Sequence, residues 1–173
     1  MRESVKLLRS LTAILFLSII FTGTGNAALI KFNATIDGAQ ADAGAGSGSL
    51  ATGIGMAWLD DVTLDFSWDV SWNGLTDVTA AHFHGPATPL ANAGVQVAID
   101  INNNPSTGNA TLTAQQASDL MNGLWYINIH TLNEPSGEIR GQVLVDVATP
   151  ASILLFAPAL LGLFFLRRRN VQD

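Results

Sequence analysis

Three histidines are the residues whose spacing most clearly permits chemistry. His82 and His84 stand in AAHFHGP (80–86), and His130 stands in WYINIHT (125–131). On a β-strand, residues i and i+2 point to the same face, about 6.5–7 Å apart along the chain. His82 and His84 therefore share a face. If the strand with His130 is their neighbour, three imidazoles converge, which is enough for a zinc or copper site with one open position.

Two other interpretations of these histidines stay open. An imidazole can bridge two backbone groups and hold a strand end or a loop in place, or it can take part in catalysis. The chain has no cysteine, which excludes a thiolate ligand, a disulfide and a cysteine nucleophile. The G-x-S-x-G, H-E-x-x-H, EF-hand and phosphate-binding glycine motifs do not occur in the sequence either. We therefore predict a protein that is not an enzyme.

The elements that must position the histidines are strands. The segment 62–72 (VTLDFSWDVSW) alternates between apolar and polar residues without a fault, which is typical of a strand with one buried and one exposed face. The four tryptophans, Trp58, Trp68, Trp72 and Trp125, could form a sugar-binding platform. The alternation instead favours Trp68 and Trp72 as core residues. Six further strands are predicted at 29–36, 50–59, 78–84, 95–101, 124–131 and 138–147.

Turn and helix signals separate these strands. The segments 102–109 (NNNPSTGN) and 133–137 (NEPSG) predict a polar loop and a hairpin turn, and 38–49 (GAQADAGAGSGS) predicts a mobile loop. Thr113 and Gln116 form a capping box that predicts a short helix over 113–122, with Leu120 as its core contact. About seven short strands and one helix indicate an all-β fold, an antiparallel β-sandwich of the immunoglobulin or superoxide dismutase type.

Two paired motifs resemble the CHRD domain family. The first is VTAAHFHGPA (78–87), and the second is GLWYINIHT (123–131) followed by GEIRGQ (137–142). The resemblance covers about 29–147 and implies a β-sandwich, without implying a biochemical activity. Within the second motif, Glu138 and Arg140 share one strand face. We expect them to form a cross-strand ion pair or to bond a loop carbonyl.

The N-terminal 27 residues have the pattern of a signal peptide. Three basic residues lie in the first ten positions, an apolar core spans 11–21, and Gly25-Asn26-Ala27 meets the small-x-small requirement for cleavage. The apolar core is too short to span a hydrocarbon layer of ~30 Å comfortably. The sequence therefore predicts removal of residues 1–27 and export of the remainder, with an uncleaved anchor as the alternative.

The C-terminal segment 147–173 predicts a transmembrane helix with a basic tail. Residues 147–166 are uncharged and mostly apolar, and three arginines follow at 167–169. This layout resembles the PEP-CTERM sorting signals in their VPLPA variant, with Val147, Pro150 and Ala151 at matching positions. The resemblance implies an exosortase-type membrane enzyme as a partner that removes the tail. A permanent anchor in the cytoplasmic membrane is the alternative.

Charge and composition limit the remaining functions. The formal net charge is −6, and the predicted domain at 28–146 holds twelve acidic and two basic residues. A nucleic-acid partner is excluded, because it would require a basic face. We therefore expect a surface or extracellular-matrix module that binds an extracellular polymer or protein without catalysis. The alternative is a copper or zinc protein with a redox role, by analogy with copper-zinc superoxide dismutases.

Overall fold

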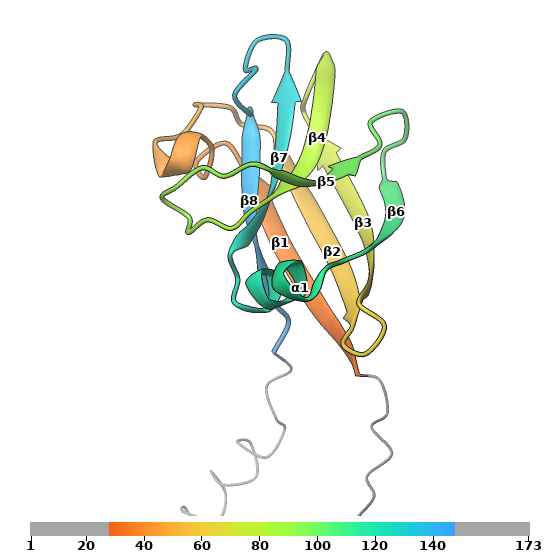
Figure 1. The fold of residues 1–173 in the computed structure, drawn as a ribbon. Helices are drawn as coiled ribbons and strands as arrows, with labels where there is room; N and C mark the ends of the chain where they lie inside the picture. Colours follow the sequence, from red (N-terminus) through yellow and green to blue (C-terminus); the bar gives the residue numbers. More distant parts are fainter. Residues whose placement is uncertain (1–27, 148–173) are drawn as a thin grey trace, which may run out of the picture.

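A computed structural model describes residues 28–147 of the chain. Within this range the protein consists of short strands, one 3₁₀ turn and one α-helix (Figure 1). In chain order these elements are β1 (Leu29–Asp37), η1 (Asp42–Gly44), β2 (Thr52–Asp60), β3 (Asp65–Asn73), β4 (Val78–His84), β5 (Val95–Ile99), β6 (Ser106–Thr111), α1 (Ala114–Met121), β7 (Trp125–Thr131) and β8 (Ile139–Val145).

The strands form one eight-stranded sheet in the order β5-β4-β7-β8-β1-β2-β3-β6. Every neighbouring pair is antiparallel. The sheet curls so that β4 and β5 lie in front of β2 and β3 (Figure 1). Phe83 of β4 accordingly meets Phe66 of β3 edge to face, with ring centroids 5.1 Å apart. The predicted antiparallel all-β architecture with one short helix is confirmed. The two layers that pack against each other belong to a single curled sheet, because β8 is hydrogen-bonded to both β7 and β1.

The apolar face of each strand lines the space inside the curl. Phe66, Trp68 and Val70 of β3 are at most 6% exposed, and Trp125 of β7 is fully buried. Trp72 is only half-buried and packs at the margin of this core. Burial of a large apolar side chain contributes about 1.5–3 kcal/mol, so these residues fix which face of each strand points inward.

The strand predicted over 62–72 begins three residues later than expected. Asp60 Oδ1 accepts hydrogen bonds from the backbone N–H of Val62 (2.9 Å) and of Thr63 (2.8 Å), which closes a turn. These bonds to the ionised carboxylate lower the pKa of Asp60. Leu64 follows with a φ of 61°, and Val62 is 66% exposed. The alternating pattern was therefore wrong at its start, because a side-chain cap competes with strand pairing.

The polar segment 102–109 was predicted as a loop, but its second half belongs to strand β6. Ser106–Thr111 pairs with Asp65–Val70 of β3 at the edge of the sheet. An edge strand with an exposed outer face needs few apolar residues, so its composition resembles that of a loop. Gly108 faces the Trp68 ring, where any Cβ would collide with the indole.

The segment 38–49 carries more structure than its composition suggested. It contains the turn η1. The Ser47 hydroxyl donates to the backbone carbonyl of Glu138 (2.6 Å), and the Ser49 hydroxyl donates to the Glu138 carboxylate (2.7 Å). These bonds tie the loop to the start of β8. A run of small polar residues does not reveal such long-range partners.

The predicted capping box at the start of α1 is confirmed. The Thr113 N–H donates to Gln116 Oε1 (2.9 Å), and the Gln116 N–H donates to Thr113 Oγ1 (3.2 Å). Leu120 is fully buried beneath the helix, and Gly123 leaves the helix with a φ of 69°. The helix therefore begins, packs and ends as the sequence indicated.

No helix within residues 28–147 is long and apolar enough to cross a membrane. The predicted signal peptide at 1–27 lies outside the described residues. The predicted C-terminal helix and basic tail also lie outside them, except for their first residue, Val147.

Gly141 allows β8 to approach β1 closely, and we predict that Gly141→Ala destabilises the fold. The added Cβ would collide with the backbone carbonyl of Thr35, which cannot move out of the way as a flexible side chain can. Denaturant unfolding should show a loss of about 1–3 kcal/mol in the free energy of unfolding. Gly94→Ala is the control, because no atom lies within 4 Å of the added Cβ there. Equal stability of the two variants would contradict this packing.

Candidate metal centre

The three histidines lie on the outer face of two paired strands. In β4, Ala81 and Phe83 point into the core, so His82 and His84 point the other way. β4 pairs with β7, and in that register Ala80 lies opposite His130. The predicted neighbourhood of the two histidine strands is therefore correct, and the three imidazoles share one face.

The imidazoles are close enough to share one ion. His82 Nδ1 lies 3.4 Å from His130 Nε2, and one ring nitrogen from each histidine fits within 4.8 Å of the others. Two nitrogen ligands at ~2.0–2.1 Å from a tetrahedral zinc ion are about 3.4 Å apart. The His82–His130 pair already has this spacing. The candidate ligand nitrogen of His84 lies within 4.8 Å of the other two.

Backbone carbonyls orient two of the three rings. His84 Nδ1 donates to the carbonyl of Ala93 (2.9 Å), and His130 Nδ1 donates to the carbonyl of Pro135 (2.9 Å). A carbonyl only accepts, so each Nδ1 carries the proton and each Nε2 keeps its lone pair. Metal-binding histidines are held in the same way, with the second nitrogen donating to a carbonyl or carboxylate. His84 Nε2 is buried and has no partner among the described residues.

The local environment favours neutral imidazoles at two positions. Burial lowers the pKa of His82, and the neighbouring His130 and His84 lower it further. Burial also lowers the pKa of His84, although the hydrogen bond to Ala93 opposes this effect. Only a neutral imidazole can bind a metal, so both side chains are in the ligand form at neutral pH.

The loop over residues 85–94 covers the neighbouring part of this face. Arg140 of β8 reaches it with hydrogen bonds to the carbonyls of Thr88 (3.2 Å) and Ala91 (3.0 Å) and to Asn92 Oδ1 (3.1 Å). Gln142 adds a hydrogen bond to a fourth residue of the loop. The loop is thereby fixed on the sheet, with the Ala93 carbonyl at His84.

Of the two predicted roles of Glu138 and Arg140, an ion pair or a bond to a loop carbonyl, the structure shows the second. Arg140 bonds loop carbonyls, while the Glu138 carboxylate accepts from the hydroxyls of Ser49 (2.7 Å) and Thr131 (2.6 Å). No ion pair joins Arg140 to Glu138 among the described residues. The two side chains therefore anchor two different loops to β8.

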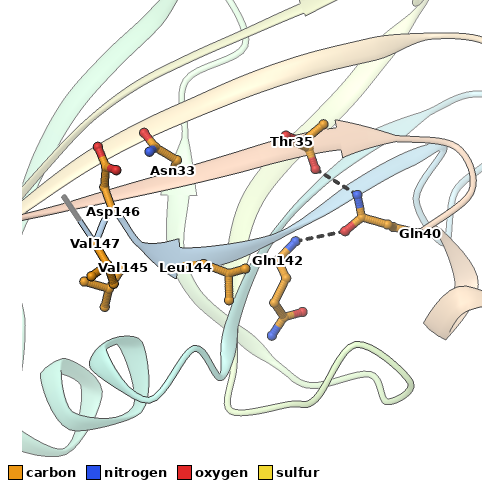
Figure 2. A pocket seen from close by; sticks show the side chains of 8 residues that line it. All are labelled: Asn33, Thr35, Gln40, Gln142, Leu144, Val145, Asp146 and Val147. Atoms are coloured by element: carbon orange, nitrogen blue, oxygen red, sulfur yellow. Dashed lines mark hydrogen bonds between the residues drawn. The ribbon is translucent and has the colours of Figure 1, made fainter. Parts of the chain in front are cut away.

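The histidine cluster is separate from two hollows of the described surface. One hollow of about 300 Å³ lies over β1 and the end of β8, where Gln40 donates to the Thr35 carbonyl (2.8 Å) and accepts from the Gln142 N–H (3.2 Å) (Figure 2). Another lies near Gly53 and Trp72. Neither hollow is lined by a histidine.

The family is shown by a match over most of this domain. Residues 32–143 match the CHRD domain, which is more than half of the chain. The chain belongs to the CHRD family. No curated protein and no solved structure matches it. CHRD domains are typical of extracellular or secreted proteins, and the three histidines lie within the matched residues of this one.

Sequence reasoning missed several parts of this candidate site. The Tyr126 ring stacks on His84 with centroids 5.1 Å apart, and its hydroxyl accepts from the Ala93 N–H (3.0 Å). Tyr126 alternates with Asn128 and His130, so strand periodicity already placed it on the same face. The carbonyls of Ala93 and Pro135 left no signal, because any residue provides a carbonyl.

The chemistry of this arrangement is that of ligand binding. Three imidazole nitrogens converge without a carboxylate or thiolate in the group. Imidazole donors suit zinc, copper, nickel and iron ions. A fourth position would be filled by water or by a donor from another molecule.

We predict that the metal-free domain loses stability as the pH falls below about 6.5, the usual pKa of histidine. The pKa values of His82 and His84 are lowered in the folded state. At pH values between these lowered pKa values and 6.5, the unfolded chain therefore binds more protons than the folded domain. Stability is therefore complete above this window and is lost as the pH falls through it. Denaturant unfolding from about pH 7.5 to about pH 5 measures the slope. A His82→Gln/His84→Gln variant with an unchanged slope would contradict this assignment.

Proposed function

We propose that the protein is an exported, non-enzymatic CHRD module of the cell surface or extracellular matrix, and that it binds one copper or zinc ion through His82, His84 and His130. One observation carries the metal site: three imidazole nitrogens lie within 4.8 Å of one another. The hydrogen bonds that orient His84 and His130 support it. A bound ion would supply Lewis-acid or redox chemistry.

The cluster offers neither a nucleophile nor a carboxylate that would orient a catalytic histidine, which supports a binding role over catalysis. No aspartate, glutamate or cysteine joins the three histidines in the described part of the chain. The open position then suits a donor from an extracellular partner, so that the ion can contribute to an interaction surface. A redox role of bound copper is the second candidate, and it is favoured by the wholly imidazole ligand set.

We further propose that an exosortase-type enzyme processes the C-terminal segment 147–173 after export. The pattern of the first 27 residues and the apolar-basic layout of the tail support this order of events. Until the tail is removed, it would hold the domain on the outer side of the cytoplasmic membrane.

Metal titration tests the site. The purified exported domain should bind one Zn²⁺ or one copper ion per chain, as measured by elemental analysis and by competition with a chelator. His84→Ala should weaken binding more than about 100-fold, because even loss of an outer partner of a metal-binding histidine costs 10–100-fold. Asn109→Ala is the control, because Asn109 is exposed on the edge strand β6. Equal affinity of both variants, or a metal-free wild type, would exclude the site.

Mass spectrometry of secreted protein tests the processing. In a host with an exosortase-type enzyme, the mature chain should begin at Ala28 and end near Pro150. Ala27→Tyr should block the cut before Ala28, because this position requires a small residue. It should leave the C-terminal segment and its cut near Pro150 unaffected. Protein that stays in the cytoplasm, intact at both ends, would contradict both export and sorting.

A further inference from the structure

Arg140 is a buried cation without an anionic partner. Its side chain is 2% exposed, and no carboxylate pairs with it among residues 28–147. Its hydrogen bonds go to neutral oxygens of the loop over 85–94. Burial accordingly lowers the pKa of the guanidinium, but an arginine keeps its charge at any physiological pH. The positive charge therefore persists and is not cancelled locally.

This charge lies one aromatic ring away from the histidine cluster. Arg140 Cζ is 3.5 Å from the centroid of the Tyr126 ring, and the other neighbour of that ring is His84, stacked at 5.1 Å with an interplanar angle of 13°. Tyr126 belongs to β7, the strand between β4 and β8. The guanidinium is thus held at a fixed position beside the nitrogen donors.

No negative charge of the cluster offsets the guanidinium. The three candidate ligands are imidazoles, and the hydrogen-bond acceptors of His84 and His130 are backbone carbonyls. The acid two residues before Arg140, Glu138, is turned toward the hydroxyls of Ser49 and Thr131. An ion at this site would therefore keep its full charge next to a second cation.

From this geometry we infer that the site is built for copper in its monovalent state, and that Arg140 sets the preference for Cu⁺ over Cu²⁺ and Zn²⁺. The inference rests on the proposed metal site. Repulsion by the guanidinium grows in proportion to the charge of the ion, so it penalises a divalent ion twice as much as a monovalent one. Three imidazole nitrogens without an anionic ligand add no charge that would favour the divalent state.

The expected size of the effect is measurable. A unit charge about 10 Å from an ion changes a one-electron equilibrium on the order of ten-fold in a medium with an effective dielectric constant of ~20. A ten-fold change in the ratio of Cu⁺ to Cu²⁺ affinity equals 59 mV in the potential of a one-electron couple. Removal of the positive charge should lower the reduction potential of bound copper by about this amount.

The test compares Arg140→Gln with Arg140→Lys. Gln removes the charge, whereas Lys keeps it on a side chain of similar reach. Cu⁺ and Cu²⁺ affinities are measured with competing chelators, and the reduction potential is measured by spectroelectrochemistry. We expect a lower potential and tighter Cu²⁺ and Zn²⁺ binding for Arg140→Gln, and values near wild type for Arg140→Lys. Equal potentials in Gln and Lys variants would overturn the inference.

Two further measurements keep the outcome decisive. If the Arg140 variants fail to fold, the wild type alone is tested, and tighter binding of Zn²⁺ than of Cu⁺ would overturn the inference. Lys31→Gln, which removes the exposed cation paired with Asp146, should leave the potential unchanged.

A wild type that binds no copper and no zinc contradicts the proposed function. A wild type that binds metal without dependence on the charge at position 140 contradicts only the present inference.

Discussion

Burial of the Phe83 ring is the interaction on which the histidine cluster depends. The ring packs edge to face against Phe66 and Trp68, with centroids 5.1 and 5.5 Å away, so it fixes the inward face of β4. Because side chains alternate along a strand, the residues on either side, His82 and His84, must point outward. A shift of one residue in the register of β4 would bury the imidazoles and expose the phenylalanine.

The polar face that results is built from three adjacent strands and covered by one loop. β4 and β7 contribute the histidines and Tyr126, and β8 contributes Arg140, which binds the loop over 85–94. The loop returns the Ala93 carbonyl to His84. The guanidinium and the imidazoles are therefore mechanically linked, and the hydrogen bonds that satisfy a buried cation also orient a neighbouring ring.

Alternation predicted most of the sheet because it reports directly on burial. It placed β4 and β7 and the shared face of His82 and His84, and the capping box of Thr113 placed the helix. It was wrong where burial is not the deciding term. Asp60 caps a turn inside an alternating run, and β6 forms at an exposed edge from polar residues. The hydrogen-bond partners of Arg140 lie about 50 positions earlier in the chain, beyond any local pattern.

The strand order also determines which end of the domain is free. β1 begins and β8 ends at one end of the sheet, where Phe32 lies opposite Val145. His130 is the last residue but one of β7, and β7 ends next to the turn that leads into β8, at the opposite end of the sheet from the start of β1 (Figure 1). If the domain is immobilised through either end of residues 28–147, for example on a bead or a sensor chip, the His130 end of β7 therefore points away from the attachment.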